Sequence, residues 1–257
     1  MKLLGILNTV LLVGLMLVIA FERGRGGDPA QLAQAEARYV EGMELLDTDD
    51  DAARGKFRES AAILANANVD SAGLHFNRAN ALLQAGDLGE AIGSYRAAQL
   101  RAPSDDRIAT NLVEARSKVL RPLGAPAPTT LEQACGLWSW LDEQTRLLIA
   151  VGFACSLVVA LQNRARGTGI ACAILGTIVA ATVAADIARR ANANLAVVTE
   201  PTVIRKGNGD GFEQVVAEPL PIGTECRIVE SRPGWIEVEL APPIRGWIKS
   251  TTAVEVP

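Results

Sequence analysis

Apolar side chains between His75 and Asp106 recur every three or four residues, which is the period of an amphipathic helix. The first stripe consists of Phe76, Ala79, Leu82 and Leu83. It stops at Gly86-Asp87, and a second stripe follows with Ala91, Tyr95 and Ala98. Pro103 ends the second stripe, because proline cannot continue a helix. The pattern predicts two helices packed against each other as a hairpin.

The small and aromatic positions of this hairpin match those of a tetratricopeptide repeat (TPR), whose period is 34 residues. Ala79, Ala91 and Ala98 allow two helix backbones to approach closely, and Tyr95 fills the gap beside them. A TPR hairpin cannot bury its apolar face alone, so it needs stacked neighbours on both sides.

The chain supplies such neighbours as an internal repeat. Residues 37–46 align on residues 74–83, although this first repeat is degenerate. A further helix is predicted over Ile108–Arg121, because Leu74 and Asn77 recur 34 residues later as Ile108 and Asn111. We therefore expect TPR-like helical repeats over residues 28–121. The alternative is an ordinary amphipathic helical bundle without a repeat.

The overall composition indicates membrane segments rather than one large soluble core. The 257-residue chain combines a mean hydropathy of +0.19 with only 4% aromatic residues. Its formal charge of −4 and isoelectric point near 5.2 argue against nucleic acid as a main partner. The cysteines are Cys135, Cys155, Cys172 and Cys226. They form no CxxC pair, so neither a metal site nor a disulfide framework is expected.

The first apolar segment lies within residues 1–27, where a run from Leu3 to Phe21 follows a single lysine. The run is long enough to span a bilayer, which needs roughly 20 residues. A signal peptide cleaved near Ala20 fits equally well. Both alternatives direct export of the residues that follow.

A second apolar region follows a linker. Residues 122–144 combine three prolines with Trp138 and Trp140. The tryptophans are expected either at the membrane–water interface or packed on the helical repeats. Two apolar runs, Leu147–Gln162 and Thr168–Ala185, then predict a transmembrane helical hairpin within residues 145–187.

Charges near this hairpin bear on its orientation. Arg164 and Arg166 lie between the two apolar runs, and the positive-inside rule places such a tip in the cytoplasm. The helical repeats and the C-terminal region would then lie on the periplasmic or outer side of a bacterial inner membrane. Arg189 and Arg190, just after the second run, argue against this orientation.

Residues 195–257 change to short β-rich runs separated by Gly and Pro turns, which is typical of a small barrel. The expected strands are Ala196–Val198, Thr202–Arg205, Gln214–Ala217, Glu225–Glu230, Trp235–Leu240 and Arg245–Lys249. The segment PIGTECRIVESRPGWIEVELAPPIRGWIKS resembles a bacterial SH3-like domain, and this resemblance implies binding of peptides or cell wall. Trp235 and Trp247 are expected to fill the barrel core or to shape a surface groove, and the core is favoured for Trp247.

The expected fold is thus multidomain, with α-helical TPR hairpins, a transmembrane helical hairpin and a small β-barrel. This order of modules resembles the TPR/SH3 membrane proteins of the aerotolerance-operon (Bat) family. The likeness rests on Phe76, Asn77, Asn80, Gly86, Ala91, Tyr95, Pro103, Asp106–Arg116, Gly234-Trp235 and Gly246-Trp247. The degenerate first repeat and Pro242-Pro243 depart from the family pattern. The resemblance implies partners with von Willebrand factor A domains and a MoxR-type ATPase.

No catalytic constellation is recognisable in the sequence. The single histidine, His75, lies in a repeat helix and is expected to serve in packing. Gly207–Gly211 (GNGDG) lies in the β-rich region and is expected to form a turn rather than a nucleotide-binding loop. Asp186 is expected at the membrane interface with Arg189 or Arg190 as its partner, rather than as a functional membrane carboxylate.

An acidic cluster lies between the first two predicted helices, at Asp47, Asp49, Asp50 and Asp51. A calcium loop of the EF type would need a glycine and a distant glutamate, which this cluster lacks. We therefore expect a solvated turn whose last aspartates cap the following helix. No metal and no cofactor are expected.

Two functions fit these features. In the first, the chain is a non-enzymatic membrane scaffold whose repeats bind other membrane proteins in a groove lined by the first helix of each repeat. The expected groove residues are Phe76, Asn80, Leu83 and Gln84, with Thr110 and Glu114 from the next helix. Asn80 is the expected hydrogen-bonding residue, whereas Asn77 is expected to support the adjoining repeat. In the second, the SH3-like barrel binds peptidoglycan or a stem peptide, and the repeats are accessory.

Overall fold

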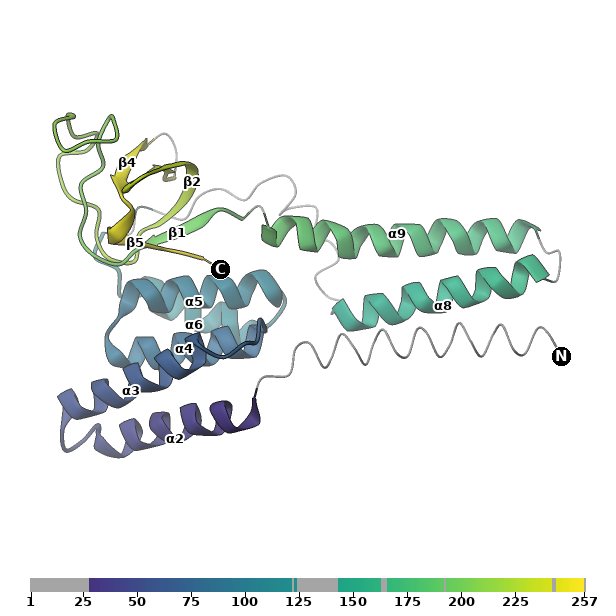
Figure 1. Ribbon diagram of the computed structural model, residues 1–257, viewed down its shortest axis with the longest axis horizontal. Coiled ribbons are helices and arrows are strands. Elements are labelled where there is room, and N and C mark those ends of the chain that lie inside the picture. Colours follow the sequence, from purple (N-terminus) through teal and green to yellow (C-terminus); the bar gives the residue numbers. More distant parts are fainter. Residues whose placement is uncertain are drawn as a thin grey trace. The chain divides into compact units, whose positions relative to one another are not determined.

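The computed structural model describes residues 28–121, 123, 143–162, 166–191, 193–241 and 244–256. This part of the chain is mixed α and β, with seven α-helices and a five-stranded antiparallel sheet (Figure 1). The helices are α2 (Pro29–Leu45), α3 (Asp50–Ala65), α4 (Ala72–Ala85), α5 (Leu88–Arg101), α6 (Asp106–Ser117), α8 (Glu143–Gln162) and α9 (Arg166–Ala191). The strands are β1 (Leu195–Val198), β2 (Glu225–Arg232), β3 (Trp235–Glu239), β4 (Arg245–Lys249) and β5 (Ala253–Glu255). The predicted export segment, Cys135, Trp138 and Trp140 lie outside the described residues.

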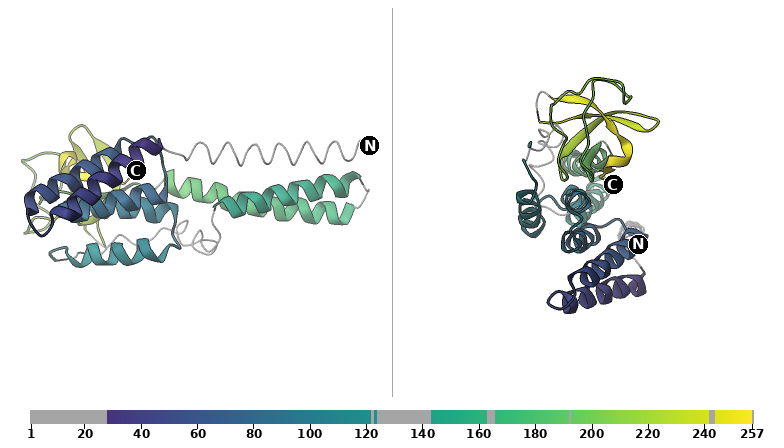
Figure 2. Two further views of the ribbon diagram at one scale, coloured as in Figure 1. Left: turned by 90° about the horizontal axis from the view of Figure 1, so that it is seen from below. Right: turned by 90° about the vertical axis from the view of Figure 1, so that its left-hand side faces the viewer.

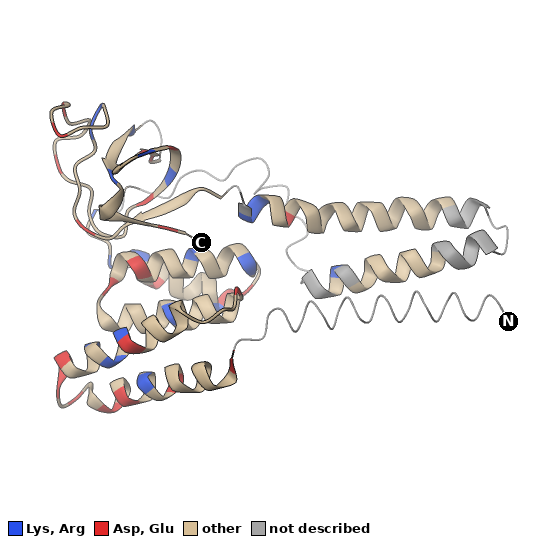
Figure 3. Ribbon diagram, viewed as in Figure 1, with Lys and Arg blue, Asp and Glu red and all other residues tan. Residues whose placement is uncertain are grey.

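The described elements divide into two compact units. Helices α2–α6 and the sheet form one unit, and α8 with α9 forms the other. Charged residues are spread along α2–α6, whereas long central stretches of α8 and α9 carry none (Figure 3). The two units therefore differ in how much charge their helices carry.

Polar side chains fix the starts of four helices. Asp28, Asp49, Ser71 and Asp105 each accept a hydrogen bond from a backbone N–H of the first turn. Each bond satisfies a donor that the helix itself leaves unpaired. Asp49 of the acidic cluster caps α3, whereas the last two aspartates, Asp50 and Asp51, lie in the first turn of that helix, so the predicted capping is confirmed for Asp49. In the described part of the chain, no group of three or more His, Cys, Asp or Glu side chains could hold a metal ion.

The helical hairpin predicted from the apolar stripes is confirmed as α4 and α5. Helix α4 ends where Gly86 takes a left-handed conformation, with φ of 85°, which glycine adopts without steric cost. Helix α5 ends at Arg101, two residues before Pro103. The small and aromatic residues that define the stripe, Ala79, Ala91, Tyr95 and Ala98, are fully buried.

Helix α6 is shorter than predicted. The sequence pattern predicted a helix that continues to Arg121, but α6 ends at Ser117. Arg121 has φ of 54°, a left-handed conformation that a right-handed helix cannot contain. Helices α2 to α6 pack against one another in sequence order, as two helix pairs followed by one further helix (Figures 1 and 2).

The sheet has the strand order β4-β3-β2-β1-β5, and all neighbouring strands are antiparallel. Four predicted runs correspond to β1–β4. The runs Thr202–Arg205 and Gln214–Ala217 instead make isolated bridges in the long connection between β1 and β2, and Arg205 also bridges to Trp247 of β4. The glycine-rich segment Gly207–Gly211 forms a turn in that connection, as predicted. Strand β5 was missed, because three residues are too few to show an alternating pattern.

The helices and the sheet share a hydrophobic core. Val197 of β1 packs with Ile92 and Tyr95 of α5 in one buried cluster. Gly89 of α5 permits this approach, because a Cβ atom there would lie 2.4 Å from the carbonyl oxygen of Val198. The sheet is therefore packed on the helices and is not a freely tethered module.

A buried carboxylate joins the same two layers. Glu225, at the start of β2, is only 6% exposed. Its two oxygens accept hydrogen bonds from Arg116 Nε (2.6 Å) and Arg116 Nη2 (3.0 Å). Arg96 Nε lies 3.0 Å from the same carboxylate. Arginines from α5 and α6 thus neutralise a charge that would be costly to bury alone.

Helices α8 and α9 form an antiparallel hairpin (Figures 1 and 2). Gly176 of α9 lies against Phe153 of α8, where an added Cβ atom would meet the Phe153 Cβ at 3.1 Å. Among the described helices, Ile170–Arg190 is the one segment long and apolar enough to cross a membrane, with a mean hydropathy of 2.1. One of the two predicted spans therefore meets the requirement of length and composition.

The prediction for Asp186 was incomplete. Its carboxylate pairs with Arg146 of α8, and Arg189 Nε lies 3.6 Å from its Oδ1. All three side chains are buried. Spacing along one helix identified Arg189, but it could not identify a partner on the facing helix.

Candidate functional site

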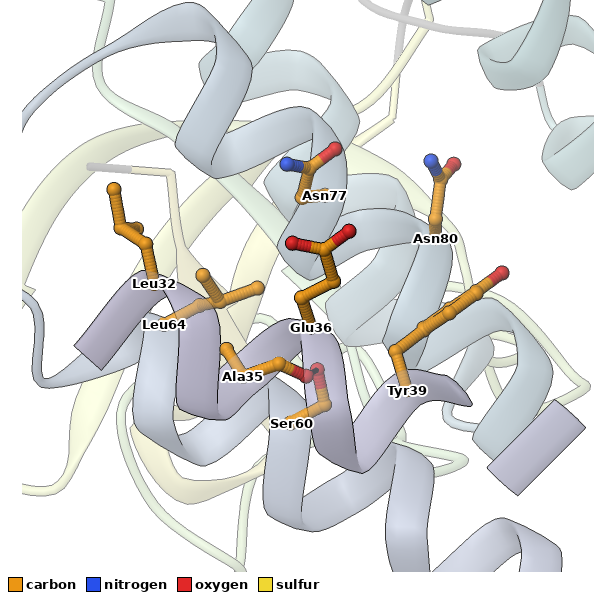
Figure 4. Close-up of a pocket in the computed structure, with 8 residues that line it drawn as sticks. All are labelled: Leu32, Ala35, Glu36, Tyr39, Ser60, Leu64, Asn77 and Asn80. Carbon is orange, nitrogen blue, oxygen red and sulfur yellow. Dashed lines mark hydrogen bonds between the residues drawn. The ribbon is translucent and has the colours of Figure 1, made fainter. Parts of the chain in front are cut away.

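A cavity of about 390 Å³ opens between α2 and α4, and buried residues of α3 form its base (Figure 4). We refer to it as the α2–α4 groove. Its lining residues are Leu32, Ala35, Glu36 and Tyr39 from α2, Ser60 and Leu64 from α3, and Asn77 and Asn80 from α4. Figure 4 shows Leu32 and Leu64 at one end, Tyr39 and Asn80 at the other, and Glu36 with Asn77 between them. The groove thus combines an apolar end with a polar centre.

The base of the groove is held by a buried hydrogen bond. Ser60 Oγ donates to the carbonyl oxygen of Ala35 at 2.8 Å. This bond fixes α3 against α2 at the level of the groove, where an unpaired hydroxyl would be destabilising. The position of the α2 wall is therefore set by the fold.

The amide of Asn80 is held by two neighbours. The Tyr95 hydroxyl donates to Asn80 Oδ1 at 2.6 Å, and Asn111 Nδ2 donates to the same oxygen at 3.0 Å. Because both neighbours donate, the Asn80 oxygen is occupied and its NH₂ group is left as the donor for a ligand. Burial raises the pKa of Tyr95 to about 12, so its hydroxyl remains a donor at neutral pH.

Tyr39 forms a wall of the groove from α2. Its ring packs on Phe57 with the ring centroids 5.1 Å apart. Burial raises the pKa of Tyr39, and a hydrogen bond with Gln84 opposes this effect. Gln84, one of the expected groove residues, therefore contacts the wall of the groove without lining it.

Two other expected groove residues serve mainly in packing. The Phe76 ring lies edge-on to Tyr95, with centroids 6.0 Å apart. The Arg107 guanidinium lies 5.9 Å from the Phe76 ring centroid. Leu83 is half-buried against the hydrophobic clusters of α4 and α5. Neither apolar side chain lines the α2–α4 groove.

The expected residues of α6 lie apart from this groove. Thr110 and Glu114 are exposed on α6, and Glu114 lies 3.5 Å from Lys118 in an ion pair along the same helix. Of the six expected groove residues, Asn80 alone lines the cavity. Asn77, which we expected to support the adjoining repeat, is instead exposed and lines the cavity beside it.

The residues of α2 were missed by sequence reasoning. The internal alignment matched Tyr39 of α2 to Phe76, one of the expected groove residues, so it could have indicated that α2 contributes to the groove. The expected groove positions nevertheless lay only on α4 and α6. Glu36 and Leu32 lie one and two turns before Tyr39 and face the same cavity.

The two tryptophans of the sheet occupy different environments. Trp247 is 6% exposed, and the Arg232 guanidinium lies 4.7 Å from its ring centroid. Trp235 is half-buried, with Lys249 Nζ 5.8 Å from its ring centroid. Phe212, in the long β1–β2 connection, is 51% exposed. The sheet therefore presents aromatic side chains at its surface as well as in its core.

His75 lies buried near the start of α4. Its Nε2 is 2.9 Å from Asp70 Oδ1, and Arg101 of α5 pairs with the same carboxylate. Burial lowers the pKa of His75, and the Asp70 carboxylate opposes this only in part. The imidazole is therefore neutral at pH 7, and through Asp70 it ties the start of α4 to the end of α5.

The three cysteines in the described residues are free. Cys155 and Cys172 are half-buried in α8 and α9, whereas Cys226 is buried in β2. Burial raises the pKa of the Cys226 thiol to about 12. A thiol that stays protonated at neutral pH is a poor nucleophile and a poor metal ligand.

No protein-family model, curated protein or solved structure matches this chain. Its function is therefore inferred from the geometry of the groove and from the sequence.

Proposed function

We propose that this chain is a non-enzymatic, membrane-anchored scaffold whose α2–α4 groove binds a segment of another protein. The observation that carries the proposal is the oriented amide of Asn80 in a cavity of about 390 Å³. A fixed N–H donor beside apolar side chains suits the backbone carbonyl groups of an extended segment. Because Tyr95 and Asn111 already hold the donor, less conformational entropy is lost on binding.

The arrangement of the helices supports a TPR interpretation. Helices α2 and α4 are the first members of two successive helix pairs, and both contribute to the groove. Stacked helical repeats characteristically use such a continuous surface to bind proteins. We also interpret the five-stranded sheet as an SH3-like barrel, because its sequence resembles such a domain.

The resemblance to the Bat family suggests the class of partner. We propose membrane proteins that carry von Willebrand factor A domains, acting with a MoxR-type ATPase. The apolar segment Ile170–Arg190 supports anchoring in a membrane. The proposed location is a bacterial inner membrane, with the helical and sheet unit on the periplasmic or outer side.

Cross-linking in intact cells, followed by purification through a C-terminal tag, tests the proposal. Asn77→Arg places a long side chain in the groove and leaves the Tyr95–Asn80–Asn111 hydrogen bonds untouched. Gln34→Arg, on the exposed surface of α2 outside the groove, is the matched control.

The wild-type chain and Gln34→Arg should recover the same von Willebrand factor A proteins, and Asn77→Arg should lose them. Circular dichroism of the purified variants checks that the helices are retained. Equal recovery with folded Asn77→Arg contradicts the assignment of the groove.

A second candidate function rests on aromatic residues at the surface of the sheet and of its long β1–β2 connection. Phe212 is exposed and Trp235 is half-buried beside Lys249, and such side chains can stack on sugars or peptides. This function is binding of peptidoglycan or a stem peptide. The full chain in detergent should then sediment with purified cell wall, and Phe212→Ala should reduce sedimentation. A fragment of the sheet alone is unsuitable, because Val197 packs on α5.

A further inference from the structure

The α2–α4 groove is electrostatically one-sided. Of the eight residues that line it, Glu36 is the one that carries a charge at neutral pH. Figure 4 shows its carboxylate in the middle of the groove, below Asn77. A ligand that fills the groove must therefore come close to a negative charge.

Glu36 is not used to hold the fold together. Within the described residues no salt bridge involves Glu36, whereas Glu41 on the same helix pairs with Arg38 (2.8 Å) and Lys56 (3.1 Å). Arg38 is also engaged by Glu59 at 3.3 Å. The cations of α2 and α3 nearest in sequence are thus committed to other carboxylates.

The surrounding helices carry the same sign of charge. Residues 28–121 contain fifteen Asp and Glu side chains against eleven Lys and Arg side chains. A surplus of one sign attracts ligands of the opposite sign and repels those of the same sign. An acidic segment would meet repulsion both at Glu36 and from the rest of the helical region.

We propose that the segment bound in the α2–α4 groove carries a lysine or arginine whose cation pairs with Glu36. The inference rests on the proposed function, because it gives the chemistry of the same bound segment. Asn80 donates to a backbone carbonyl group of the segment, and Glu36 accepts from its cation. Leu32 and Leu64 contact an apolar neighbour. A donor, an acceptor and an apolar contact at fixed positions set the register of the segment.

Photo-cross-linking tests this inference in the full chain. A photoreactive amino acid replaces Leu32, which lines the groove, in cells that contain the natural partners. The cross-linked segment is then identified by mass spectrometry. We expect a lysine or arginine within about three residues of the cross-linked position, since an extended chain rises roughly 3.3 Å per residue.

Charge reversal provides the decisive comparison. Glu36→Lys should lower the cross-linking yield about fivefold, the upper end of the range for an exposed ion pair. Changing the basic residue of the identified segment to glutamate should restore the yield with Glu36→Lys. Glu44→Lys, also exposed on α2 but outside the groove, is the control and should behave as wild type.

The outcomes separate the inference from the proposed function. A cross-linked segment without a basic residue, or an unchanged yield with Glu36→Lys, overturns the inference and leaves the groove as a protein-binding site. If neither Leu32 nor Asn77 yields a cross-link when replaced by the photoreactive residue, the proposed function itself fails.

Discussion

Replacing Gly89 by alanine should destabilise this protein, although alanine favours helices more than glycine does. Gly89 lies in the first turn of α5, where the helix meets β1. An added Cβ atom would lie 2.4 Å from the carbonyl oxygen of Val198 and 2.9 Å from the Cα atom of Thr199. Both are backbone atoms, so no side chain can rotate away and the helix must separate from the strand.

The expected change in the free energy of unfolding follows from two opposing effects of the added Cβ atom. Forcing extra atoms into a packed interior costs about 1–3 kcal/mol. The gain in helix propensity is at most about 1 kcal/mol, and less in a first turn. Gly89→Ala should therefore lower the free energy of unfolding by about 1–2 kcal/mol. At about 2–4 °C per kcal/mol for a unit of this size, Tm should fall by about 2–8 °C.

Two other glycines provide controls with the same chemical change. At Gly55 in α3 an added Cβ atom would have no neighbour within 4 Å, so Gly55→Ala should raise Tm by about 2–4 °C. At Gly93 the added atom would meet the side chains of Val254 at 3.2 Å and Val197 at 3.9 Å but no backbone atom, so the change in Tm for Gly93→Ala should fall between those for Gly89→Ala and Gly55→Ala.

Thermal unfolding of the full chain in detergent, monitored by circular dichroism, ranks the three glycine variants and the wild type by Tm. Hydrogen exchange reports the contact itself, because the amides of β1 and α5 should exchange faster in Gly89→Ala. A Gly89→Ala variant as stable as wild type, with unchanged protection of β1, would refute the close packing of the sheet on α5.

Three further outcomes are expected. Glu225→Gln should lower the free energy of unfolding by about 2–3 kcal/mol in a denaturant titration, because two arginines lose their buried counter-charge; a loss under 0.5 kcal/mol, on the order of a surface pair, would contradict this. Tyr95→Phe should cost about 1 kcal/mol and weaken cross-linking in the groove, because Asn80 keeps only one of its two hydrogen bonds; unchanged cross-linking would argue against an oriented amide. Stability should fall as the pH drops below the ordinary histidine pKa of 6.5, because burial lowers the folded-state pKa of His75 and the unfolded chain binds the proton first. His75→Gln should remove this part of the pH dependence, and an identical profile in that variant would exclude His75 as its source.

The helical hairpin was predictable because its signals are local. The stripe through Ala79 and Tyr95 defines which faces meet, and Gly86 and Pro103 mark where the helices end. The cap at Asp49 was predictable for the same reason. Each of these features depends on residues a few positions apart, which share one helix or one turn.

The α2–α4 groove was only partly predictable. Its residues come from three helices, and their meeting depends on how α2 is rotated against α4. Asn80 could be assigned because it lies in the helical hairpin, where the apolar pattern is clearest. Glu36 gave no signal in the sequence, because an exposed glutamate on a helix is usual and only the cavity beside it distinguishes this one.

The contact between the sheet and the helices was not predictable from local patterns. Glu225 and Arg116 are separated by 109 residues, yet their side chains form a hydrogen-bonded pair. In the sequence, Gly89 looks like a weak position in a helix, whereas in the structure it is the point of closest approach to β1. Long-range partners of this kind appear only once the chain is folded.

The contact between β1 and α5 links the two candidate binding surfaces, the α2–α4 groove and the sheet. Val197 of β1 packs on Ile92 and Tyr95 of α5 in one buried cluster. The hydroxyl of that same Tyr95 holds the Asn80 amide in the groove. Separation of the sheet from α5 would therefore remove packing from the residue that orients the groove donor. The sheet and the groove are not independent modules, and a ligand that loosens the sheet should also weaken binding in the groove.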